Sequence, residues 1–240
     1  LGRDRFPLVF FRERCADMGL SAEDIDESYI ARAQAVLLTG THLSTETTRA
    51  ASRAAMEAAH ASNTKVVLDI DYRPVLWGLT GKGDGESRYV ESKRVTEVLQ
   101  DFLPGCHLVV GTEEELRIAG GEEDVEAAVQ KVHALSQAPV VLKMGAHGCK
   151  IFGDMADAPR TISGVEVAVL NVLGAGDAFM AGLMRGWLGE SSLDAGARYG
   201  HACGALVVSR HACAPAIPTR AELDDYLGRA QSVPRIARAP

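Results

Sequence analysis

The stretch Asn171-Val172-Leu173-Gly174-Ala175-Gly176-Asp177-Ala178-Phe179 is the most informative part of this sequence. An apolar run at 165–170 precedes it and a small-residue helical pattern at 178–188 follows it, so the sequence predicts a strand, a glycine turn and a helix. Gly174 and Gly176 carry no Cβ, which lets backbone N–H groups approach an anion. The positive end of the helix dipole favours negative charge at the same place.

Asp177 would add a carboxylate beside this predicted anion pocket. An anion pocket next to a proton acceptor is what phosphoryl transfer to a hydroxyl requires. The alternative is a tight strand-to-helix turn in which Asp177 is only an acidic residue of the first helical turn. Two common phosphate-binding motifs are excluded, because no G-x-x-x-x-G-K-[ST] occurs and a G-x-G-x-x-G pattern starting at Gly174 ends on Phe179.

The composition is that of a globular protein. The 240 residues carry a formal net charge of −7, with 47% hydrophobic and 24% charged residues, and the basic residues are scattered, so a nucleic-acid partner is not expected. No apolar run is long enough to span a membrane, and no signal peptide is visible. The five cysteines lack C-x-x-C spacing, which indicates reduced thiols and predicts a cytoplasmic protein.

Apolar runs alternate with helical patterns along most of the chain. Runs typical of strands lie at 6–12, 35–39, 65–71, 108–110, 140–143, 149–152 and 165–170. Helical patterns lie at 21–24, 44–60, 92–102, 125–135, 177–188 and 193–209, and further helices start at Thr112 and Thr219. The alternation predicts an α/β fold with a mostly parallel sheet covered on both faces, in which ligands bind beyond the carboxyl ends of the strands. We expect one domain over residues 1–232 and a loose tail at 233–240.

Polar residues follow two of the predicted strands. Asp69, Asp71 and Arg73 project to one side of an extended segment, and Arg73 is suited to bind a carboxylate or a phosphate. A surface ion-pair ladder and a metal-binding D-x-D of a sugar-nucleotide transferase are alternatives for this segment. Thr112 and Glu115 have the spacing of a capping box, but Glu115 could also lie near Mg²⁺ and nucleotide phosphates.

Other candidate residues are less specific. Lys143 precedes a glycine turn, Gly145 to Gly148, that could be only a hairpin turn between two strands. Arg12 follows two aromatic residues and, taken alone, is typical of a surface arginine. His201-x-Cys203 and His211-x-Cys213 do not have the spacing of a common zinc site, so we expect core packing and a loop there.

Together these segments resemble the ribokinase-like (PfkB) family of carbohydrate kinases. Gly174-Ala-Gly-Asp177 followed by Ala178-Phe179 is similar to the C-terminal signature of that family. Asp69-Ile-Asp71-Tyr-Arg73-Pro74, with Leu76-Trp77 behind it, is similar to the D-x-N-x-R-P-x-L-W stretch of its sugar-acid kinases, and Phe10-Phe11-Arg12 to their aromatic-aromatic-arginine segment. The likeness also includes 39–44 and 111–116, and it runs in order over nearly the whole chain.

The resemblance implies a three-layer α/β sandwich and ATP-dependent phosphorylation of a primary hydroxyl on a keto sugar acid, with Mg²⁺ as the metal. The first expectation for the acceptor is 5-dehydro-2-deoxygluconate of inositol catabolism. A kinase of 2-keto-3-deoxygluconate and a non-catalytic sugar- or nucleotide-binding remnant are the alternatives. The partners implied are ATP and the sugar acid, and a homodimer and a monovalent cation are left open.

Each candidate residue receives a role from the same resemblance. The residues implied for catalysis are Asp177, as the base that accepts the hydroxyl proton, and the backbone anion hole of Gly174, Ala175 and Gly176. The residues implied for the sugar acid are Arg12, Arg73, Asp69 and His42. The residues implied for ATP are Lys143, Gly145, Gly148 and Thr112, with Glu115 for Mg²⁺.

The chain departs from the family pattern in three places. Thr112 stands where asparagine is usual, and Asn171 stands where many members have an aspartate near a monovalent-cation site, which leaves potassium dependence open. The sequence also shows no counterpart of the family's first strands, of a glycine pair near the sugar, or of a small β lid. We therefore expect the 240 residues alone to be a poor kinase, because part of the sugar pocket and its water-excluding cover would be missing.

Overall fold

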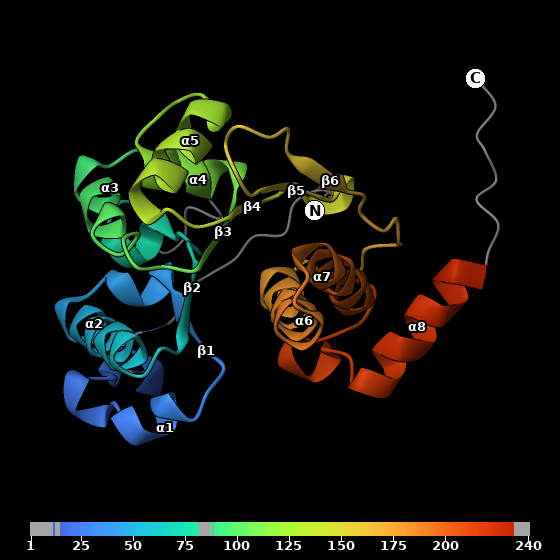
Figure 1. Cartoon of the computed structure of the whole chain (residues 1–240), viewed down its shortest axis with the longest axis horizontal. Helices are drawn as coiled ribbons and strands as arrows, with labels where there is room; N and C mark the ends of the chain where they lie inside the picture. Colours follow the sequence, from blue (N-terminus) through green and yellow to red (C-terminus); the bar gives the residue numbers. More distant parts are fainter. Residues whose placement is uncertain (1–11, 13–14, 82–86, 88, 233–240) are drawn as a thin grey trace. The chain divides into compact units, whose positions relative to one another are not determined.

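The structure is a computed structural model that describes residues 12, 15–81, 87 and 89–232 (Figure 1). The chain forms two compact units. Unit 1 holds the described residues up to Met144 together with Cys149–Thr161, and unit 2 holds Gly145–Gly148 and the described residues from Ile162 onward. The single domain over 1–232 stays a prediction, and the tail predicted at 233–240 and most of the strand predicted at 6–12 lie outside the described residues.

A six-stranded sheet forms within the described residues, and its strand order equals the chain order. Its strands are β1 (Ala35–Thr39), β2 (Lys65–Asp69), β3 (Leu108–Thr112), β4 (Val140–Lys143), β5 (Cys149–Phe152) and β6 (Arg160–Ile162). β1 to β4 pair in parallel, whereas β5 runs antiparallel to β4. The α/β class and the mostly parallel sheet are therefore confirmed.

The central strands are buried on both faces. Val66, Val67 and Leu68 of β2 have no exposed surface, and neither do Leu108 and Val109 of β3. Continuous apolar burial is typical of parallel strands in α/β proteins, which explains why these segments do not alternate between apolar and polar residues.

Strand β1 has a different burial pattern. Leu38 is only 6% exposed, whereas the neighbouring Leu37, which points to the opposite face, is 45% exposed. One face of β1 is therefore not covered by the residues that the structure describes.

The helices of unit 1 begin where the sequence provides capping side chains. They are α1 (Glu27–Ala31), α2 (Glu46–Ala61), α3 (Lys93–Gln100), α4 (Glu113–Gly120) and α5 (Val125–Ser136). Thr45, Thr112 and Asp124 accept hydrogen bonds from backbone N–H groups three residues further on, at the starts of α2, α4 and α5. Each such cap satisfies an otherwise unpaired N–H group and contributes about 1 kcal/mol.

Short 3₁₀ helices connect the main elements. They are η1 (Ala16–Gly19), η2 (Ala22–Asp24), η3 (Gly40–Leu43), η4 (Pro74–Trp77), η5 (Gly145–His147) and η6 (Ala214–Ala216). The helix predicted to start at Ser21 is η2, a single 3₁₀ turn. The N–H of Ser21, the residue that caps this turn, donates to Asp24 Oδ2 at 2.9 Å, so the capping box is present although the helix that it starts is only one turn long.

Unit 2 is helical, with α6 (Ala175–Glu190), α7 (Leu193–Val208) and α8 (Arg220–Ser232). Figure 1 shows α6 and α7 side by side. Their backbones nearly touch, because a Cβ on Gly182 would lie 2.5 Å from the carbonyl carbon of Tyr199, and a Cβ on Gly186 would lie 2.5 Å from the Cα of Gly196. The small-residue pattern of these two helices is therefore explained by close helix packing.

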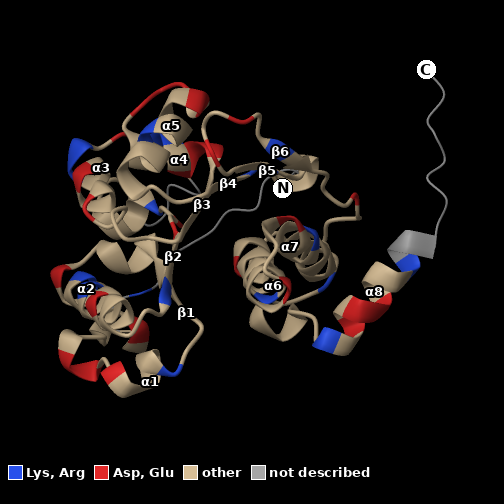
Figure 2. Ribbon diagram, viewed as in Figure 1, with Lys and Arg blue, Asp and Glu red and all other residues tan. Residues whose placement is uncertain are grey.

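Charges of both signs are interspersed along the described helices (Figure 2). On α8, Arg220 pairs with Asp224 at 3.5 Å and Arg229 pairs with Asp225 at 2.9 Å, each one helical turn apart. Exposed pairs of this kind contribute little to stability, and their mixed signs do not form a basic stripe.

The strand predicted at 165–170 is wrong. The chain there carries no strand assignment, and Val169 and Leu170 are 50% and 53% exposed. Instead, the N–H groups of Leu170 and Asn171 both donate to the carbonyl oxygen of Val208, at 2.8 and 3.2 Å. An apolar run alone predicted a strand, but the segment has no neighbouring strand in the described part of the chain.

Candidate functional site

Three neighbouring strands of unit 1 end in polar residues. β2 ends at Asp69, β3 at Thr112 and β4 at Lys143. Lys143 Nζ lies 2.8 Å from Asp69 Oδ1 and 3.6 Å from Glu115 Oε2. The three charged side chains are only 13%, 10% and 7% exposed, in the order Lys143, Asp69, Glu115. The carboxyl ends of the strands therefore meet in a buried group of ion pairs.

Arg73 extends this group on its other side. Its Nη2 lies 2.8 Å from Asp71 Oδ1, and its Nη1 lies 3.6 Å from Glu115 Oε1. We call Asp69, Asp71, Arg73, Glu115 and Lys143 the strand-end cluster. Two cations thus hold three carboxylates within hydrogen-bond or ion-pair range in unit 1.

Burial and mutual charge shift the titration of the strand-end cluster. Burial raises the pKa of Asp69 to about 6, against the opposing effect of Lys143. Burial acts to lower the pKa of Lys143, but its carboxylate neighbours outweigh it and raise that pKa above the ordinary range. Burial also acts to raise the pKa of Asp71, but Arg73 and the hydroxyl of Thr41 outweigh it, so this pKa is lowered. Lys143 is therefore a firmly held cation at neutral pH.

Glu115 also belongs to the start of helix α4. The Thr112 N–H donates to Glu115 Oε2 at 2.8 Å, and the Glu115 N–H donates to Thr112 Oγ1 at 3.3 Å. The capping box is therefore confirmed. The capping box uses Oε2 of Glu115, whereas Oε1 lies 3.6 Å from Arg73 Nη1. The capping box therefore does not exclude a role of Glu115 toward Mg²⁺, which stays a prediction.

A second polar group of unit 1 joins Arg12 to His42, which lies in η3 directly after β1. Arg12 forms an ion pair with Asp17, and His42 Nε2 lies 3.9 Å from Asp17 Oδ2. Burial lowers the pKa of His42, and the nearby positive charge of Arg12 adds to that effect. The two candidate sugar-acid residues therefore lie close together. The sequence did not predict Asp17, for which the only signal was an acidic residue shortly after Arg12.

The glycine turn before α6 is the functional candidate of unit 2. Gly174 caps the helix with a φ of +85°, and a Cβ there would lie 2.6 Å from Cys213 Sγ, so the fold itself requires this glycine. Gly176 differs, because it lies within α6 and a Cβ there would meet nothing within 4 Å. Neither a positive φ nor a close contact requires a glycine at position 176, and its predicted role in an anion hole stays a prediction.

Asp177 lies beside this turn and is exposed. Within the described ranges its carboxylate has no hydrogen bond or ion pair. Asn171 holds the preceding loop instead, because its Oδ1 accepts the Leu173 N–H at 2.9 Å and its Nδ2 donates to the Ala212 carbonyl at 3.1 Å. The first turn of α6 therefore presents N–H groups and a free carboxylate on an anchored loop.

The turn at Gly145 to Gly148 has a structural reason for both of its glycines. Their φ values are +58° and +97°, in the left-handed region that favours glycine. A Cβ on Gly148 would lie 2.0 Å from the carbonyl oxygen of Ile162, whereas one on Gly145 would meet nothing within 4 Å. The hairpin interpretation is thus sufficient for Gly148, and a role next to a nucleotide stays a prediction.

The predicted site residues divide between the two units. Unit 1 holds Arg12, His42, Asp69, Arg73, Thr112, Glu115 and Lys143. Unit 2 holds Gly145, Gly148, Gly174, Ala175, Gly176 and Asp177. The structure brings all of the first set except Thr112 into the two polar groups described above, and Thr112 is hydrogen-bonded to Glu115 of the strand-end cluster. Sequence reasoning missed Thr39 and Thr41, whose hydroxyls donate to Asp71, and the bond from Asn171 to the Ala212 carbonyl, because these contacts join distant parts of the chain.

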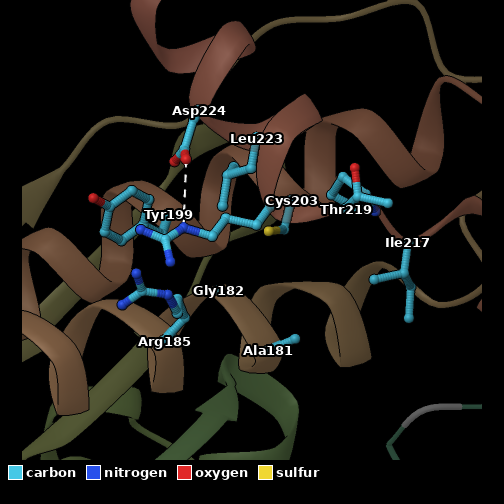
Figure 3. Close-up of a pocket in the computed structure, with 11 residues that line it drawn as sticks. Ala181, Gly182, Arg185, Tyr199, Cys203, Ile217, Thr219, Leu223 and Asp224 are labelled. Atoms are coloured by element: carbon cyan, nitrogen blue, oxygen red, sulfur yellow. Dashed lines mark ion pairs between the residues drawn. The ribbon is translucent and has the colours of Figure 1, made fainter.

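A separate pocket of about 170 Å³ lies among α6, α7 and α8 of unit 2 (Figure 3). Arg185, Tyr199 and Asp224 gather at one end of it and Ile217 lies at the other. Burial raises the pKa of the lining Cys203 thiol to about 11, so this thiol is neutral at physiological pH. None of the predicted site residues lines this pocket.

The described residues lack two features that would point to other functions. No group of three or more His, Cys, Asp or Glu side chains in the described part of the chain is arranged to hold a metal ion. None of the described helices is long and apolar enough to cross a membrane.

A mostly parallel α/β sheet with charged strand ends, together with a glycine turn at a helix N-terminus, defines a class of proteins suited to bind anionic ligands. Comparison with known families makes this class more specific. Residues 5–220 match the model of the pfkB family of carbohydrate kinases, so the chain belongs to that family.

Related sequences agree with the family assignment. The chain is 32% identical over 227 residues to a protein from Shouchella clausii named 5-dehydro-2-deoxygluconokinase, covering 93% of this chain and 65% of the relative. A Geobacillus kaustophilus protein of the same name is 30% identical, with 92% of this chain and 63% of the relative covered. The chain thus spans slightly less than two thirds of the length of these relatives.

Solved structures share the fold. A fructokinase from Vibrio cholerae O395, in a form bound to fructose, ADP and calcium, superposes with a TM-score of 0.73 at 22% identity over 90% of this chain and 67% of that one. A PfkB protein from Polaromonas sp. JS666 gives a TM-score of 0.70 at 26% identity, over 89% of this chain and 64% of that one. The ribokinase-like fold predicted from the sequence is therefore confirmed.

Proposed function

We propose that this chain transfers the γ-phosphoryl group of ATP to a primary hydroxyl of a keto sugar acid, with 5-dehydro-2-deoxy-D-gluconate of inositol catabolism as the acceptor. Membership of a carbohydrate kinase family supports a sugar kinase activity. Relatives named 5-dehydro-2-deoxygluconokinase support this particular acceptor. The absence of any disulfide among the five cysteines is compatible with the reducing cytoplasm.

The observation that carries the proposal is the pair Gly176 and Asp177. Gly176 has open space where a Cβ would be, and Asp177 is an exposed carboxylate in the same helical turn. The N–H groups of this turn, with Gly174 and Ala175, would bind the transferring phosphoryl group and stabilise its charge. As the sugar oxygen bonds to the γ-phosphorus and the bond to ADP breaks, the hydroxyl proton would move to Asp177.

Unit 1 would bind the sugar acid. Arg12 and Arg73 each carry a guanidinium group that can bind a carboxylate through two hydrogen bonds. Both already contact carboxylates, Asp17 and Asp71 respectively. We propose that these contacts hold the guanidinium groups in position, with His42 and Asp69 on the sugar side.

The nucleotide side would use Thr112, Lys143 and the turn at Gly145 to Gly148. Glu115 fits a role toward Mg²⁺, because its Oε1 is not used by the capping box and Mg²⁺ needs few protein carboxylates when it also binds waters and phosphates. The ion would neutralise phosphate charge.

A comparison of acceptors tests the proposal. The purified chain receives Mg²⁺ and ATP with 5-dehydro-2-deoxygluconate, 2-keto-3-deoxygluconate or D-fructose, and ADP release and phosphorylated product are measured against a reaction without acceptor. We expect the highest kcat/KM for the first compound. A higher value for the second would identify a 2-keto-3-deoxygluconate kinase, and ATP binding without turnover on any acceptor would identify a non-catalytic remnant.

Two further properties can be measured on the same protein. Turnover in potassium and in tetramethylammonium buffers shows whether a monovalent cation is used, since Asn171 supplies an amide and no negative charge. Light scattering measures whether the chain forms the homodimer that the resemblance leaves open.

A further inference from the structure

Asp71 has an unusual backbone conformation directly after strand β2. Its φ is +33°, in a region that residues other than glycine rarely adopt, although aspartate and asparagine tolerate it best. Such a conformation costs about 1–3 kcal/mol and persists only where the surrounding contacts determine it. The contacts of the Asp71 carboxylate are therefore the first place to look for a reason.

One oxygen of Asp71 binds the turn that follows β1. Oδ2 accepts hydrogen bonds from Thr41 Oγ1 at 2.7 Å and from Thr39 Oγ1 at 3.1 Å. The backbone of this turn comes equally close, since a Cβ on Gly40 would lie 1.9 Å from the carbonyl oxygen of Ile70. The segment that carries His42 is thereby fixed to the end of β2.

The other oxygen of Asp71 binds Arg73. Oδ1 lies 2.8 Å from Arg73 Nη2, while Arg73 Nη1 donates to the Tyr72 carbonyl at 3.0 Å and lies 3.6 Å from Glu115 Oε1. These contacts engage both terminal nitrogens of the guanidinium group and restrain its orientation. Arg73 is 27% exposed, so part of the group remains open to solvent.

We infer that Asp71 is a positioning residue, which holds Arg73 with one carboxylate oxygen and the His42-bearing turn with the other. Two groups from different strands are thereby kept in one arrangement before a sugar acid binds. A preformed arrangement lowers the cost of ordering side chains on binding. This inference rests on the proposed function for the ligand, but the hold of Asp71 on Arg73 does not.

The substitution Asp71→Asn isolates the charge. Asparagine has the same shape, tolerates the left-handed conformation, and its carbonyl oxygen can still accept from the two threonines, but it cannot form the ion pair with Arg73. We expect at least a tenfold higher KM for 5-dehydro-2-deoxygluconate, with the KM for ATP changed less than twofold. A merely structural role would change both KM values together.

The matched control is Asp26→Asn. Asp26 is also a carboxylate of unit 1 that accepts a serine hydroxyl, from Ser28 at 2.7 Å, and a backbone N–H, from Tyr29 at 3.0 Å. It contacts none of the candidate residues, so neither KM should change. Thr41→Val removes a hydroxyl that donates to Asp71 Oδ2 without altering any charge, and we expect a smaller rise in the sugar-acid KM.

A spectroscopic measurement makes the test independent of catalysis. The ¹⁵N NMR signal of the Arg73 Nε–H group should shift, and its exchange with water should accelerate, in Asp71→Asn but not in Asp26→Asn. If the wild type phosphorylates no sugar acid and this signal still changes, the proposed function fails while the hold of Asp71 on Arg73 stands. An unchanged signal, or a lower sugar-acid KM in Asp71→Asn, would overturn the inference, the latter because Asp71 would then compete with the substrate for Arg73.

Discussion

The strand-end cluster of unit 1 and the α6 turn of unit 2 differ in how many of their polar groups have partners within the fold. In the cluster, every charged group has a partner of opposite charge, and three of the five side chains are at most 13% exposed. In the α6 turn, Asp177 has no such partner among the described residues and Gly176 borders open space. Charge pairing within the fold therefore accounts for the contacts of the cluster, whereas no contact within the described residues accounts for Gly176 and Asp177, for which we propose a ligand.

The largest expected effect is on turnover and concerns the α6 turn. Asp177→Asn should lower kcat about 10²–10⁴-fold, because the base for the hydroxyl proton is lost. The residue is exposed, so the melting temperature should hardly change and ATP affinity should stay within a few-fold. Steady-state kinetics and calorimetric titration of ATP measure the two quantities. A near-normal kcat would remove Asp177 from the mechanism.

A substitution in the strand-end cluster should instead lower the free energy of unfolding. Lys143→Met leaves Asp69 and Glu115 without their shared cation, and removing one partner of a buried ion pair typically costs about 3–5 kcal/mol of unfolding free energy. Because the pKa of Asp69 is already about 6, the loss should be smaller at pH 5, where the carboxyl is largely protonated, than at pH 8.

Urea unfolding at both pH values measures this loss. The matched control is Lys93→Met, whose lysine pairs with Glu97 at 3.5 Å but is 90% exposed, so little or no loss is expected. Equal stability of the two variants would show that the strand-end cluster does not hold unit 1 together.

The comparison extends to His201, a half-buried titratable group of unit 2. Burial lowers the pKa of His201 to about 4, and its Nε2 has no hydrogen-bond partner in the described part of the chain. As pH falls below the unfolded value near 6.5, the unfolded chain takes up a proton that the folded one does not accept until about pH 4. The free energy of unfolding should therefore fall by about 2–3 kcal/mol over this range.

The pH dependence of His201 is measured by difference. His201→Gln should show a flatter decline of stability between pH 6.5 and 4 than the wild type, and the exposed His211→Gln is the matched control. Parallel declines in the wild type and His201→Gln would mean that the folded state accommodates the charged imidazole.

The smallest expected changes in stability concern the two glycines of the α6 turn, and they have opposite signs. Gly174→Ala places a Cβ at a φ of +85° and against Cys213, and should cost about 1–2 kcal/mol. Gly176→Ala has open space in a helical position, and should stabilise by about 0.4–1 kcal/mol. Turnover should nevertheless fall at least tenfold in Gly176→Ala, because the methyl group occupies the space left for the phosphoryl group. Full activity of this stabilised variant would leave Gly176 without a functional reason.

Much of the fold was predictable from local sequence. The apolar runs that became β1 to β5 are short and bounded by polar residues, and the caps at Thr45, Thr112 and Asp124 mark the helix starts. The prediction failed at 165–170, where an equally apolar run has no partner strand among the described residues. Strand formation depends on such a partner, which a single run cannot supply.

The sequence by itself determined the α/β alternation, the glycine turn before Asp177, the charged residues that follow β2 and β3, and the lysine that ends β4, because these follow from periodicity and turn chemistry over a few residues. Only the tertiary structure decided that Lys143 is buried between Asp69 and Glu115, and that Asp71 holds both Thr41 and Arg73. The reason is physical: apart from the local pair Asp71–Arg73, these contacts join residues 28 to 74 positions apart, and no local pattern encodes such contacts.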